Sequence, residues 1–349
     1  MPGFAIVGAG MIAGFHLKAL AEIESARVVA VVDKVPAALE RFKEKQQLKC
    51  PVYTDLNDAL KNKDVDIVIV STPSGAHMEP AVAAAQAGKH VVVEKPLEVT
   101  LERCDRVIDA CDKNKVKLCT IFPSRFADAN RTLKAAVTAG RFGRLTLGET
   151  TCKWWRTQEY YDQGGWRGTM ALDGGGALMN QAIHNVDLLL WMMGPATHVA
   201  GFTALLAHER IEVEDTAVAT LRFKSGALGV IMATTSVHPG FPKTIAIHGD
   251  KGSAVIEQED ILQWTFNPEV PDDKQVRARF AQKVGASGGS SDPSAISHAY
   301  HAMQLRDFVE SIQANRAPMV DGREGRRAVE VILAVYESQK TGRVVEIKN

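Results

Sequence analysis

The residue whose chemistry first needs an explanation is a lysine at the end of an apolar run. The stretch HVVVEKPLE, residues 90–98, predicts a buried strand that ends in Glu94, Lys95 and Pro96. The ends of parallel strands border the ligand crevice of open α/β sheets, and proline favours an extended backbone in the residue before it. Lys95 is therefore predicted to be held beside a ligand, where its ammonium group could bind a substrate hydroxyl and stabilise a developing alkoxide. The alternative is a solvated lysine paired with Glu94.

A histidine and an asparagine in the stretch GGGALMNQAIHNVD form the second candidate group. Asn180 and His184 are four residues apart, so they share one face of a predicted helix whose other sides are apolar. A histidine near its ordinary pKa can accept the proton of an alcohol as hydride leaves, whereas a buried, hydrogen-bonded imidazole is the structural alternative. Asp187, three residues after His184, could orient the ring or lie at the surface.

A glycine-rich turn near the N-terminus predicts a dinucleotide site. The stretch GAGMIAG follows the first predicted strand and fits the pattern G-x-G-x-x-A through Gly8, Gly10 and Ala13. Gly8 permits the tight turn, and Gly10 lets the backbone approach a pyrophosphate closely. The helix that begins at Met11 and Ile12 then directs its free N–H groups and its positive dipole end at the phosphates.

The coenzyme preference is predicted from Asp33, which ends the second strand at about the expected distance from the glycines. A carboxylate there accepts hydrogen bonds from a ribose 2′-OH and repels a 2′-phosphate, so NAD is favoured over NADP. Lys34 weakens this preference for NAD, because its positive charge could partly neutralise the charge of Asp33. The structural alternative is a tight strand-to-helix turn that binds no ligand.

Other polar residues lie where the same crevice or the substrate would be. The residues after the third long strand are expected to line the adenosine or nicotinamide side with their backbone: Ser71, Thr72, Pro73 and His77. Four residues further along the chain could hold sugar hydroxyls or a phosphate: Arg125, Lys153, Arg156 and Tyr161. His298 and His301 follow a predicted flexible loop at 285–294 and could close over substrate. A surface or core position is the structural alternative for each of these residues.

The elements that must position these residues change in character near residue 122. Before it, apolar strands alternate with helices, which predicts a doubly wound parallel sheet covered on both faces. After it, long segments with strand character are separated by turns such as KSGA and GDKGS, which predicts a mostly antiparallel sheet. The fold class is therefore α/β, with a Rossmann domain at residues 1–122 and an α+β domain at 123–349 whose large open sheet serves substrate binding and oligomerisation.

The composition argues against several classes of function. The 349 residues contain 41 lysines and arginines and 41 aspartates and glutamates, so there is no basic excess that would indicate a nucleic-acid partner. Apolar runs such as VDIVIV are too short to span a membrane, and the N-terminus has no basic segment typical of a signal peptide. Five cysteines without a CxxC pair indicate buried free thiols, no metal site and a reducing cytoplasm.

Four motifs together give the chain a resemblance to a known family. The stretches GAGMIAG, STPSGAH, GKHVVVEKP and GGGALMNQAIHNVD resemble those of the Gfo/Idh/MocA family of NAD(P)-dependent sugar and cyclitol oxidoreductases, over essentially the whole chain. The resemblance implies that Lys95 and His184 flank the reacting carbinol. It also implies cofactor contacts for Glu94 and for the pair Trp166 and Arg167, which in relatives reaches the nicotinamide end.

One position departs from the pattern of the family. Many members carry aspartate four residues before the histidine, where this chain has Asn180. An amide can orient a sugar hydroxyl but cannot act as a base, so the proton acceptor is Lys95 or His184, and His184 is favoured with Lys95 charged and polarising. The NQAIH variant, with WWRTQEYY and GGWRGT, is similar to the branch that acts on nucleotide-linked or glycosidic hexoses. That branch includes UDP-N-acetylglucosaminuronate 3-dehydrogenases, and oxidation at C3 is usual in it.

The resemblance thus implies an NAD-dependent dehydrogenase that oxidises a secondary hydroxyl, at C3, of a sugar, glycoside or nucleotide sugar. One alternative is an NAD-retaining glycosidase or lyase that works through transient C3 oxidation, with Tyr161 or His298 as its further base. Another is a non-catalytic NAD-binding protein. Family analogy and the open sheet with its apolar strands further imply a homodimer or homotetramer.

Overall fold

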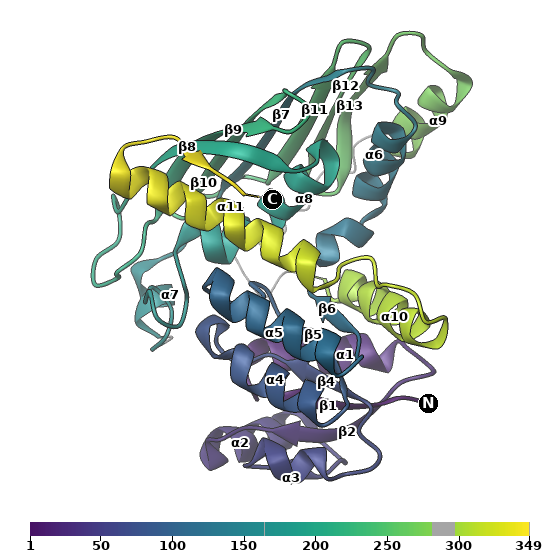
Figure 1. The fold of residues 1–349 in the computed structure, drawn as a ribbon, viewed down its shortest axis with the longest axis vertical. Helices are drawn as coiled ribbons and strands as arrows, with labels where there is room; N and C mark the ends of the chain where they lie inside the picture. Colours follow the sequence, from purple (N-terminus) through teal and green to yellow (C-terminus); the bar gives the residue numbers. More distant parts are fainter. Residues whose placement is uncertain (164, 281–296, 349) are drawn as a thin grey trace. The chain divides into compact units, whose positions relative to one another are not determined.

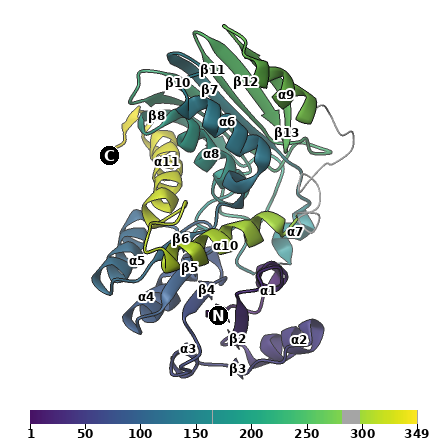
Figure 2. The same ribbon diagram turned by 90° about the vertical axis from the view of Figure 1, so that its right-hand side faces the viewer.

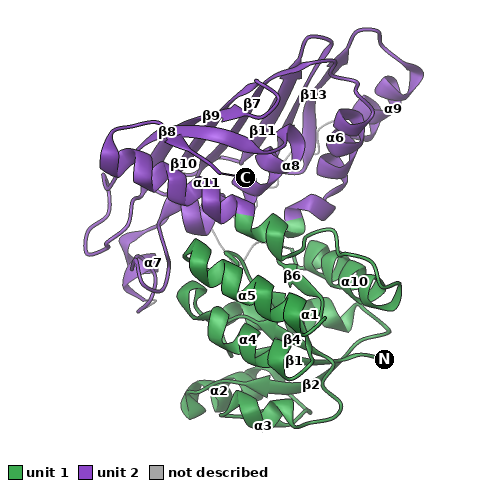
Figure 3. Ribbon diagram, viewed as in Figure 1, with its two compact units in different colours: residues 1–123, 297–326 green, residues 124–296, 327–349 purple. Residues whose placement is uncertain are grey.

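The computed structural model describes residues 1–163, 165–280 and 297–348, and the predicted loop at 285–294 lies outside these ranges. The chain forms two compact units, residues 1–123 with 297–326 and residues 124–296 with 327–349 (Figure 3). The observed division differs from the predicted one, which placed the boundary after residue 122, mainly in one late segment of the chain. Residues 297–326 return to the first unit, because the apolar side of the helix at Ala299–Gln313 joins the core of the first sheet.

The first unit is built on a parallel sheet, as the apolar strands predict. Its six strands lie in the order β3 (Val52–Tyr53), β2 (Arg27–Val32), β1 (Gly3–Val7), β4 (Ile67–Val70), β5 (His90–Val93) and β6 (Leu118–Thr120), and every neighbouring pair is parallel. The strands of the central part are buried on both faces, which is the environment that selects valine and isoleucine at consecutive positions. The doubly wound fold is thus confirmed.

Helices cover both faces of this sheet (Figures 1 and 2). On one side lie α1 (Met11–Ala21), α2 (Pro36–Gln46) and α10 (Ala299–Gln313), whose apolar residues share one core with β1 and β4. On the other side α4 (Met78–Gln86) packs against α5 (Leu101–Lys113), and a short α3 (Leu56–Leu60) precedes β4. The core that joins α1 to α10 explains why a segment late in the sequence belongs to the first unit.

The strand order places the predicted cofactor residues at one edge of the sheet. The chain runs outward from β1 through β2 to β3 and then returns to the other side of β1 as β4, which creates a topological switch point. The carboxyl ends of β1, β2, β4 and β5 are followed by Gly8, Asp33, Ser71 and Glu94. Four predicted residues from different parts of the sequence therefore follow the corresponding ends of parallel strands.

The second unit contains a larger sheet of mixed direction. Its eight strands lie in the order β13 (Asp260–Phe266), β12 (Gly252–Glu257), β11 (Thr244–Gly249), β7 (Leu145–Lys153), β10 (Leu228–Thr234), β9 (Thr216–Phe223), β8 (Ala196–Ala204) and β14 (Val345–Glu346). All neighbours are antiparallel except β7 and β10, which pair in parallel. This confirms the predicted mostly antiparallel sheet.

One face of the second sheet is covered by helices. A π-helical turn, η3 (Ala177–Ala182), leads directly into α8 (Ile183–Met193), which packs on β7 and β11. Gly148 on β7 makes room for this helix, because a Cβ atom there would lie 2.7 Å from the Met193 side chain. The remaining helices of the unit are η2 (Pro123–Phe126, which begins at the boundary), α6 (Asp128–Thr138), α7 (Gln158–Asp162), α9 (Pro271–Arg279) and α11 (Gly322–Thr341), whose first turn is assigned to the first unit. None of the helices described is long and apolar enough to cross a membrane.

Candidate active site

The glycine-rich turn after β1 has the shape that a dinucleotide requires. Gly8 has a φ of +100°, and a Cβ atom there would lie 2.7 Å from the carbonyl oxygen of Ser71, so no other residue fits. Gly10 begins α1 without a side-chain cap, and among the described residues other than Gly10 and its two chain neighbours, no atom lies within 4 Å of where its Cβ would be. The first N–H groups of α1, from Met11 and Ile12 onward, are thus available to a pyrophosphate, and the turn fits NAD.

Asp33 is fixed to this turn by its own carboxylate. One oxygen, Oδ2, accepts a hydrogen bond of 2.8 Å from the N–H of Ala9, and Oδ1 accepts one of 2.9 Å from Val35. Each carboxylate oxygen has a second lone pair, so Asp33 can still accept hydrogen bonds from ribose hydroxyls. The negative charge stands next to the glycine turn, where it opposes a 2′-phosphate, while Lys34 is exposed.

The loop after β4 is held by polar side chains that turn toward backbone atoms. Ser71 donates to the carbonyl of Val7 at 2.9 Å, and Thr72 donates to the carbonyl of Ala76 at 2.8 Å. His77 is buried between two carbonyl oxygens, 2.9 Å from that of Pro96 and 3.0 Å from that of Thr72. Burial lowers the pKa of His77. These side chains shape the loop, so the backbone is the part of it that remains for a contact with cofactor, and that contact stays a prediction.

Glu94 and Lys95 have opposite environments, which explains why an apolar strand ends in this pair. Glu94 is buried, and its Oε1 accepts a hydrogen bond of 2.8 Å from Nε2 of His16 on α1. Burial alone would raise the pKa of Glu94, but the hydrogen bond and charge of His16 outweigh burial and lower it to about 2. The other oxygen, Oε2, accepts from the N–H of Lys95 at 3.2 Å. Glu94 thus holds the backbone of the half-buried Lys95 and turns its carboxylate inward.

The two histidines predicted to close over substrate are tied to the first unit. His301 on α10 is buried, with Nε2 3.9 Å from the carboxylate of Glu94 and its ring 5.7 Å from that of His16. Burial lowers the pKa of His301 to about 4, so the imidazole is neutral near pH 7. His298 lies 2.7 Å from the carboxylate of Glu22. Both histidines therefore anchor the start of α10, in a role that the sequence did not indicate.

Asn180 and His184 lie at the junction of η3 and α8. Both are half-buried, whereas the residues between and around them are buried. The side-chain amide of Asn180 donates through Nδ2 to Oδ1 of Asp173 at 2.6 Å, and Asp173 also accepts from the N–H of Gly168 at 2.9 Å through Oδ2. A π-helical turn is frequent at functional sites, because it re-aims side chains that a regular helix would place elsewhere.

Glu214 was missed by reasoning from the sequence, although a run of three glycines gave a signal. Its carboxylate accepts from the N–H groups of Gly176 and Leu178, each at 2.9 Å, and from the hydroxyl of Tyr336 at 3.1 Å. A Cβ atom on Gly176 would lie 1.6 Å from the carbonyl oxygen of Glu214, and one on Gly175 would lie 2.1 Å from the Tyr336 hydroxyl. The glycines thus let a remote carboxylate cap the start of η3. Burial raises the pKa of Glu214 to about 7.

Arg125 and Asp187 form a buried ion pair. Nε of Arg125 donates to Oδ2 of Asp187 at 2.9 Å, and a terminal nitrogen donates to Oδ1 at 2.6 Å. Both side chains are almost fully buried, and the guanidinium lies 5.3 Å from the ring of Trp191. One edge of the Arg125 guanidinium is thus bound to a protein carboxylate. The sequence suggested that Asp187 orients His184 or lies at the surface, and it did not indicate this arginine as its partner.

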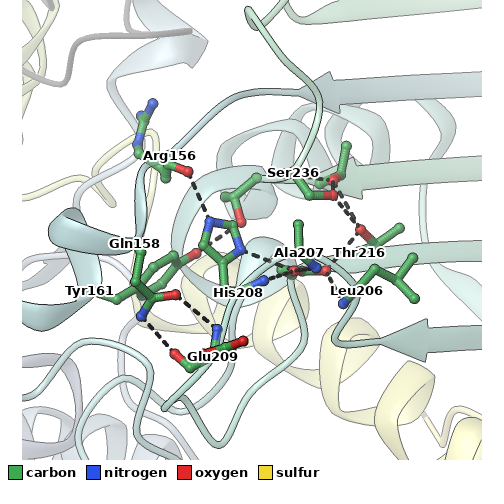
Figure 4. A network of polar contacts seen from close by, with 12 residues as sticks. Arg156, Gln158, Tyr161, Leu206, Ala207, His208, Glu209, Thr216 and Ser236 are labelled. Carbon is green, nitrogen blue, oxygen red and sulfur yellow. Dashed lines mark hydrogen bonds and ion pairs between the residues drawn. The ribbon is translucent and has the colours of Figure 1, made fainter.

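Of the three other residues predicted for substrate, Arg156 and Tyr161 lie near one another, and Lys153 lies at the end of β7. Lys153 lies on the face of the second sheet opposite to Gly148, which contacts α8, because side chains alternate along β7. Tyr161 is buried and bonds the hydroxyl of Thr235 at 2.8 Å. Arg156 is buried with its guanidinium 4.9 Å from the ring of Trp154. Figure 4 shows Arg156 and Tyr161 beside His208, which lies 2.8 Å from the Arg156 carbonyl and 3.0 Å from Asp215.

Trp166 and Arg167 lie in a turn that neighbours these aromatic residues. The guanidinium of Arg167 lies 4.6 Å from the ring of Tyr160 and 5.4 Å from the ring of Trp166. Tyr160 in turn accepts a hydrogen bond of 3.3 Å from Gln181, the residue after Asn180. The predicted cofactor pair and the predicted substrate helix are thus linked within the second unit through Tyr160. Among the described residues, no cluster of histidine, cysteine or carboxylate side chains could hold a metal ion.

Comparison with known proteins identifies the family. Residues 3–122 match the model of the oxidoreductase family with an NAD-binding Rossmann fold, and residues 130–255 match the Gfo/Idh/MocA C-terminal domain. The WlbA dehydrogenase of Chromobacterium violaceum, solved with NADH and UDP-GlcNAcA, is 35% identical with a TM-score of 0.89, over 99% of this chain and 96% of that one. The WlbA dehydrogenase of Bordetella pertussis, solved with the same two ligands, is 34% identical with a TM-score of 0.88, over 99% of both chains.

A curated relative extends the comparison. The myo-inositol 2-dehydrogenase of Thermotoga maritima is 29% identical over 98% of this chain and 98% of its own. The similarity covers both units, and it agrees with the glycine turn, the parallel sheet and the large mixed sheet described above. The chain belongs to the Gfo/Idh/MocA family and is an NAD-binding oxidoreductase.

Proposed function

We propose that the protein oxidises a secondary hydroxyl group, at C3, of a sugar, glycoside or nucleotide sugar and transfers the hydride to NAD. The observation that carries this proposal is that two half-buried candidate residues, Lys95 and Asn180, are each held by a buried carboxylate. Glu94 holds the backbone of Lys95, and Asp173 holds the side chain of Asn180. Side chains fixed in this way are suited to a substrate whose reacting atoms must be placed within a fraction of an ångström.

The roles of the residues follow from their chemistry. His184 accepts the proton of the reacting hydroxyl through an imidazole nitrogen, and the ammonium group of Lys95 stabilises the negative charge that grows on the carbinol oxygen. Asn180 accepts a hydrogen bond from a neighbouring hydroxyl of the sugar ring or donates one to it. NAD, when bound along the turn at Gly8 to Ile12 and at Asp33, supplies the acceptor for the hydride.

The substrate class is supported by relatives rather than by the site itself. The two WlbA dehydrogenases named above were solved with UDP-GlcNAcA, and the Thermotoga maritima relative is named for myo-inositol. The higher identity to the WlbA proteins favours a nucleotide sugar or a glycoside over a free cyclitol. A small-molecule substrate in the cytoplasm also agrees with five cysteines that are all free thiols.

The alternative of an NAD-retaining glycosidase or lyase finds less support. It needs a further base, for which Tyr161 and His298 were the candidates. Tyr161 is buried against Thr235, and burial raises its pKa above the ordinary range, so it stays protonated. His298 is engaged with Glu22. A non-catalytic binding protein would have no need for the buried carboxylates that hold Lys95 and Asn180.

Substitution of Lys95 tests the proposal. NADH formation is followed with a set of sugars and UDP-sugars that includes UDP-N-acetylglucosaminuronate, for the parent protein, Lys95→Ala and the exposed control Lys113→Ala. We expect Lys95→Ala to lower kcat by about 100-fold or more with NAD affinity retained, because it removes a charge that acts on the transition state. Lys113→Ala should behave as the parent. Turnover by Lys95→Ala at the parental rate would contradict the proposed mechanism.

A further inference from the structure

Asp173 connects two segments that the proposed function uses. Its Oδ1 accepts a hydrogen bond of 2.6 Å from Nδ2 of Asn180, on the helix that also carries His184. Its Oδ2 accepts one of 2.9 Å from the N–H of Gly168, which directly follows Trp166 and Arg167. The side chain is only 2% exposed, so the carboxylate makes these contacts away from bulk water. One buried group thus links the predicted cofactor turn to the predicted substrate helix within the second unit.

The chemistry of a carboxylate fixes which way Asn180 faces. An ionised carboxylate only accepts hydrogen bonds, so it must meet the NH₂ group of the amide and not its carbonyl oxygen. The contact therefore turns Oδ1 of Asn180 away from Asp173. A hydrogen bond to an ionised partner is stronger than one between neutral groups, and 2.6 Å is short for it, so the amide is held firmly.

The backbone around Asp173 is built to keep this geometry. The N–H of Asp173 donates to the carbonyl of Thr169 at 3.0 Å, which closes the turn that contains Gly168. Gly168 has a φ of +75°, and its carbonyl oxygen accepts from the N–H of Glu212 at 2.7 Å. The following Gly174 has a φ of +77°, which redirects the chain toward η3. Both ends of the contact are therefore anchored independently of it.

We propose that Asp173 is a positioning residue that orients the amide of Asn180 as a hydrogen-bond acceptor for a substrate hydroxyl and fixes it to the Trp166–Gly168 turn. This inference rests on the proposed function, because it assigns a substrate contact to Asn180. It also gives a reason for asparagine rather than aspartate at position 180. A carboxylate at 180 would lie against the carboxylate of Asp173, and two such charges at that distance cannot both be ionised without a large cost.

Exchange of the two residues tests the inference. In Asp173→Asn the oxygen of the new amide can accept a hydrogen bond from Asn180 or from Gly168, but not from both. Its NH₂ group then faces the N–H donor of the other residue, and that contact is lost. In Asn180→Asp two carboxylates face one another. In the double variant Asp173→Asn with Asn180→Asp, the amide at 173 donates to the carboxylate at 180, so the contact is restored with its polarity reversed and position 180 remains an acceptor. Asp272→Asn, exposed on α9, is the matched control.

Two readouts separate this inference from the proposed function. Equilibrium unfolding of the four proteins gives a coupling between the two positions that does not depend on any activity. Steady-state kinetics with the sugar identified by the screen gives the coupling in kcat/KM. We expect each single substitution to lower kcat/KM by about 10- to 100-fold, as loss of a buried partner does, with NAD affinity changed by less. We expect the double variant to recover most of this loss, and Asn180→Asp to regain activity as the pH falls and the pair shares a proton.

The outcomes are distinct. If the parent oxidises no sugar while unfolding still shows coupling, the proposed function fails and the contact stands. If the coupling occurs in unfolding but kcat/KM of Asp173→Asn equals that of the parent, Asp173 is structural and the positioning role is overturned. The role is also overturned if both singles lose activity and the exchange restores none of it. Equal losses in Asp272→Asn would show that charge removal in general, and not this contact, is responsible.

Discussion

Two buried glutamates show how differently one side chain responds to its surroundings. Glu94 meets a histidine donor, and its pKa falls to about 2, whereas Glu214 meets only neutral donors, and burial raises its pKa to about 7. The ordinary value for both is 4.5. A lowered pKa means that the folded state prefers the ionised form, and a raised pKa means that it prefers the protonated form. The two residues should therefore influence stability in opposite directions as the pH changes.

The free energy of unfolding should depend on Glu94 in acid. Its folded pKa lies below the ordinary value, so its contribution is complete above about pH 4.5 and is lost as the pH falls toward 2. We expect the parent to lose about 2–3 kcal/mol of unfolding free energy across this window, and Glu94→Gln to lose markedly less. Urea unfolding between pH 6 and 3 measures it. Parallel curves for the two proteins would show that Glu94 carries no such linkage.

Glu214 should act in the opposite sense at higher pH. Its folded pKa is raised, so its contribution is complete below about pH 4.5 and is lost as the pH rises through about 7. Between pH 5 and 8, we expect the parent to become less stable relative to Glu214→Gln, whose amide does not ionise. The difference in urea midpoint between the two proteins should thus change with pH in this window. A constant difference would contradict the assignment.

Among the elements, the starts of α1 and η3 use glycine for contrasting reasons. At Gly10 the space beside the Cβ position is open, whereas at Gly176 it is filled by the backbone of Glu214. The first glycine is compatible with a ligand that approaches the helix, and the second is required by the fold. The same residue type in two motifs therefore predicts two different effects of adding a methyl group.

Alanine at these two positions separates binding from stability. Gly10→Ala should fold with an unchanged melting temperature, because φ is −91° and nothing obstructs the new Cβ, yet bind NAD at least about 10-fold more weakly because the methyl group meets the pyrophosphate. Gly176→Ala should unfold at a clearly lower temperature, since its Cβ would displace Glu214. Calorimetry for stability and fluorescence titration for NADH provide the two measurements. Unweakened NADH binding by Gly10→Ala would argue against the predicted phosphate position.

Elements were predictable from the sequence to the extent that local patterns determine them. Strands covered on both faces are continuously apolar, so β1, β4 and β5 and the parallel sheet could be predicted. The place of α10 could not, because its apolar stripe would serve equally well on either sheet. The cap of η3 by Glu214 and the hydrogen bond between His16 and Glu94 could not be predicted either, because they join residues far apart in the sequence. The glycine turn and Asp33, which form one local unit, were predicted together.

At the scale of the whole molecule, the described part of the second sheet has exposed apolar side chains on neighbouring strands. Phe202 on β8 is 80% exposed and pairs across the strands with Val218 on β9, which is 47% exposed. Exposed apolar side chains on adjacent strands are typical of an interface. A second copy of the chain is the partner that we propose for this face, in a homodimer or homotetramer, since such symmetric contacts are the commonest in oligomers.

A charge on this face should disrupt the assembly. We expect the parent to sediment as a dimer or tetramer and Phe202→Glu to sediment as a smaller species, because a carboxylate cannot be buried there without a partner. Lys340→Glu, on the far end of α11, is a control that also changes charge. Sedimentation velocity at several concentrations makes the comparison. A parent that sediments as a monomer, or Phe202→Glu that assembles as the parent does, would remove the proposed interface.

The parallel pairing of β7 with β10 constrains how the second unit can fold. These neighbours are separated in the chain by residues 154–227, which include Asp173, Asn180, His184 and Glu214. The chain must close that long connection before the centre of the sheet can form, and the entropy of closure opposes it. Asn180 and His184 lie within this connection, so we expect them to reach their native positions only when the centre of the sheet has formed.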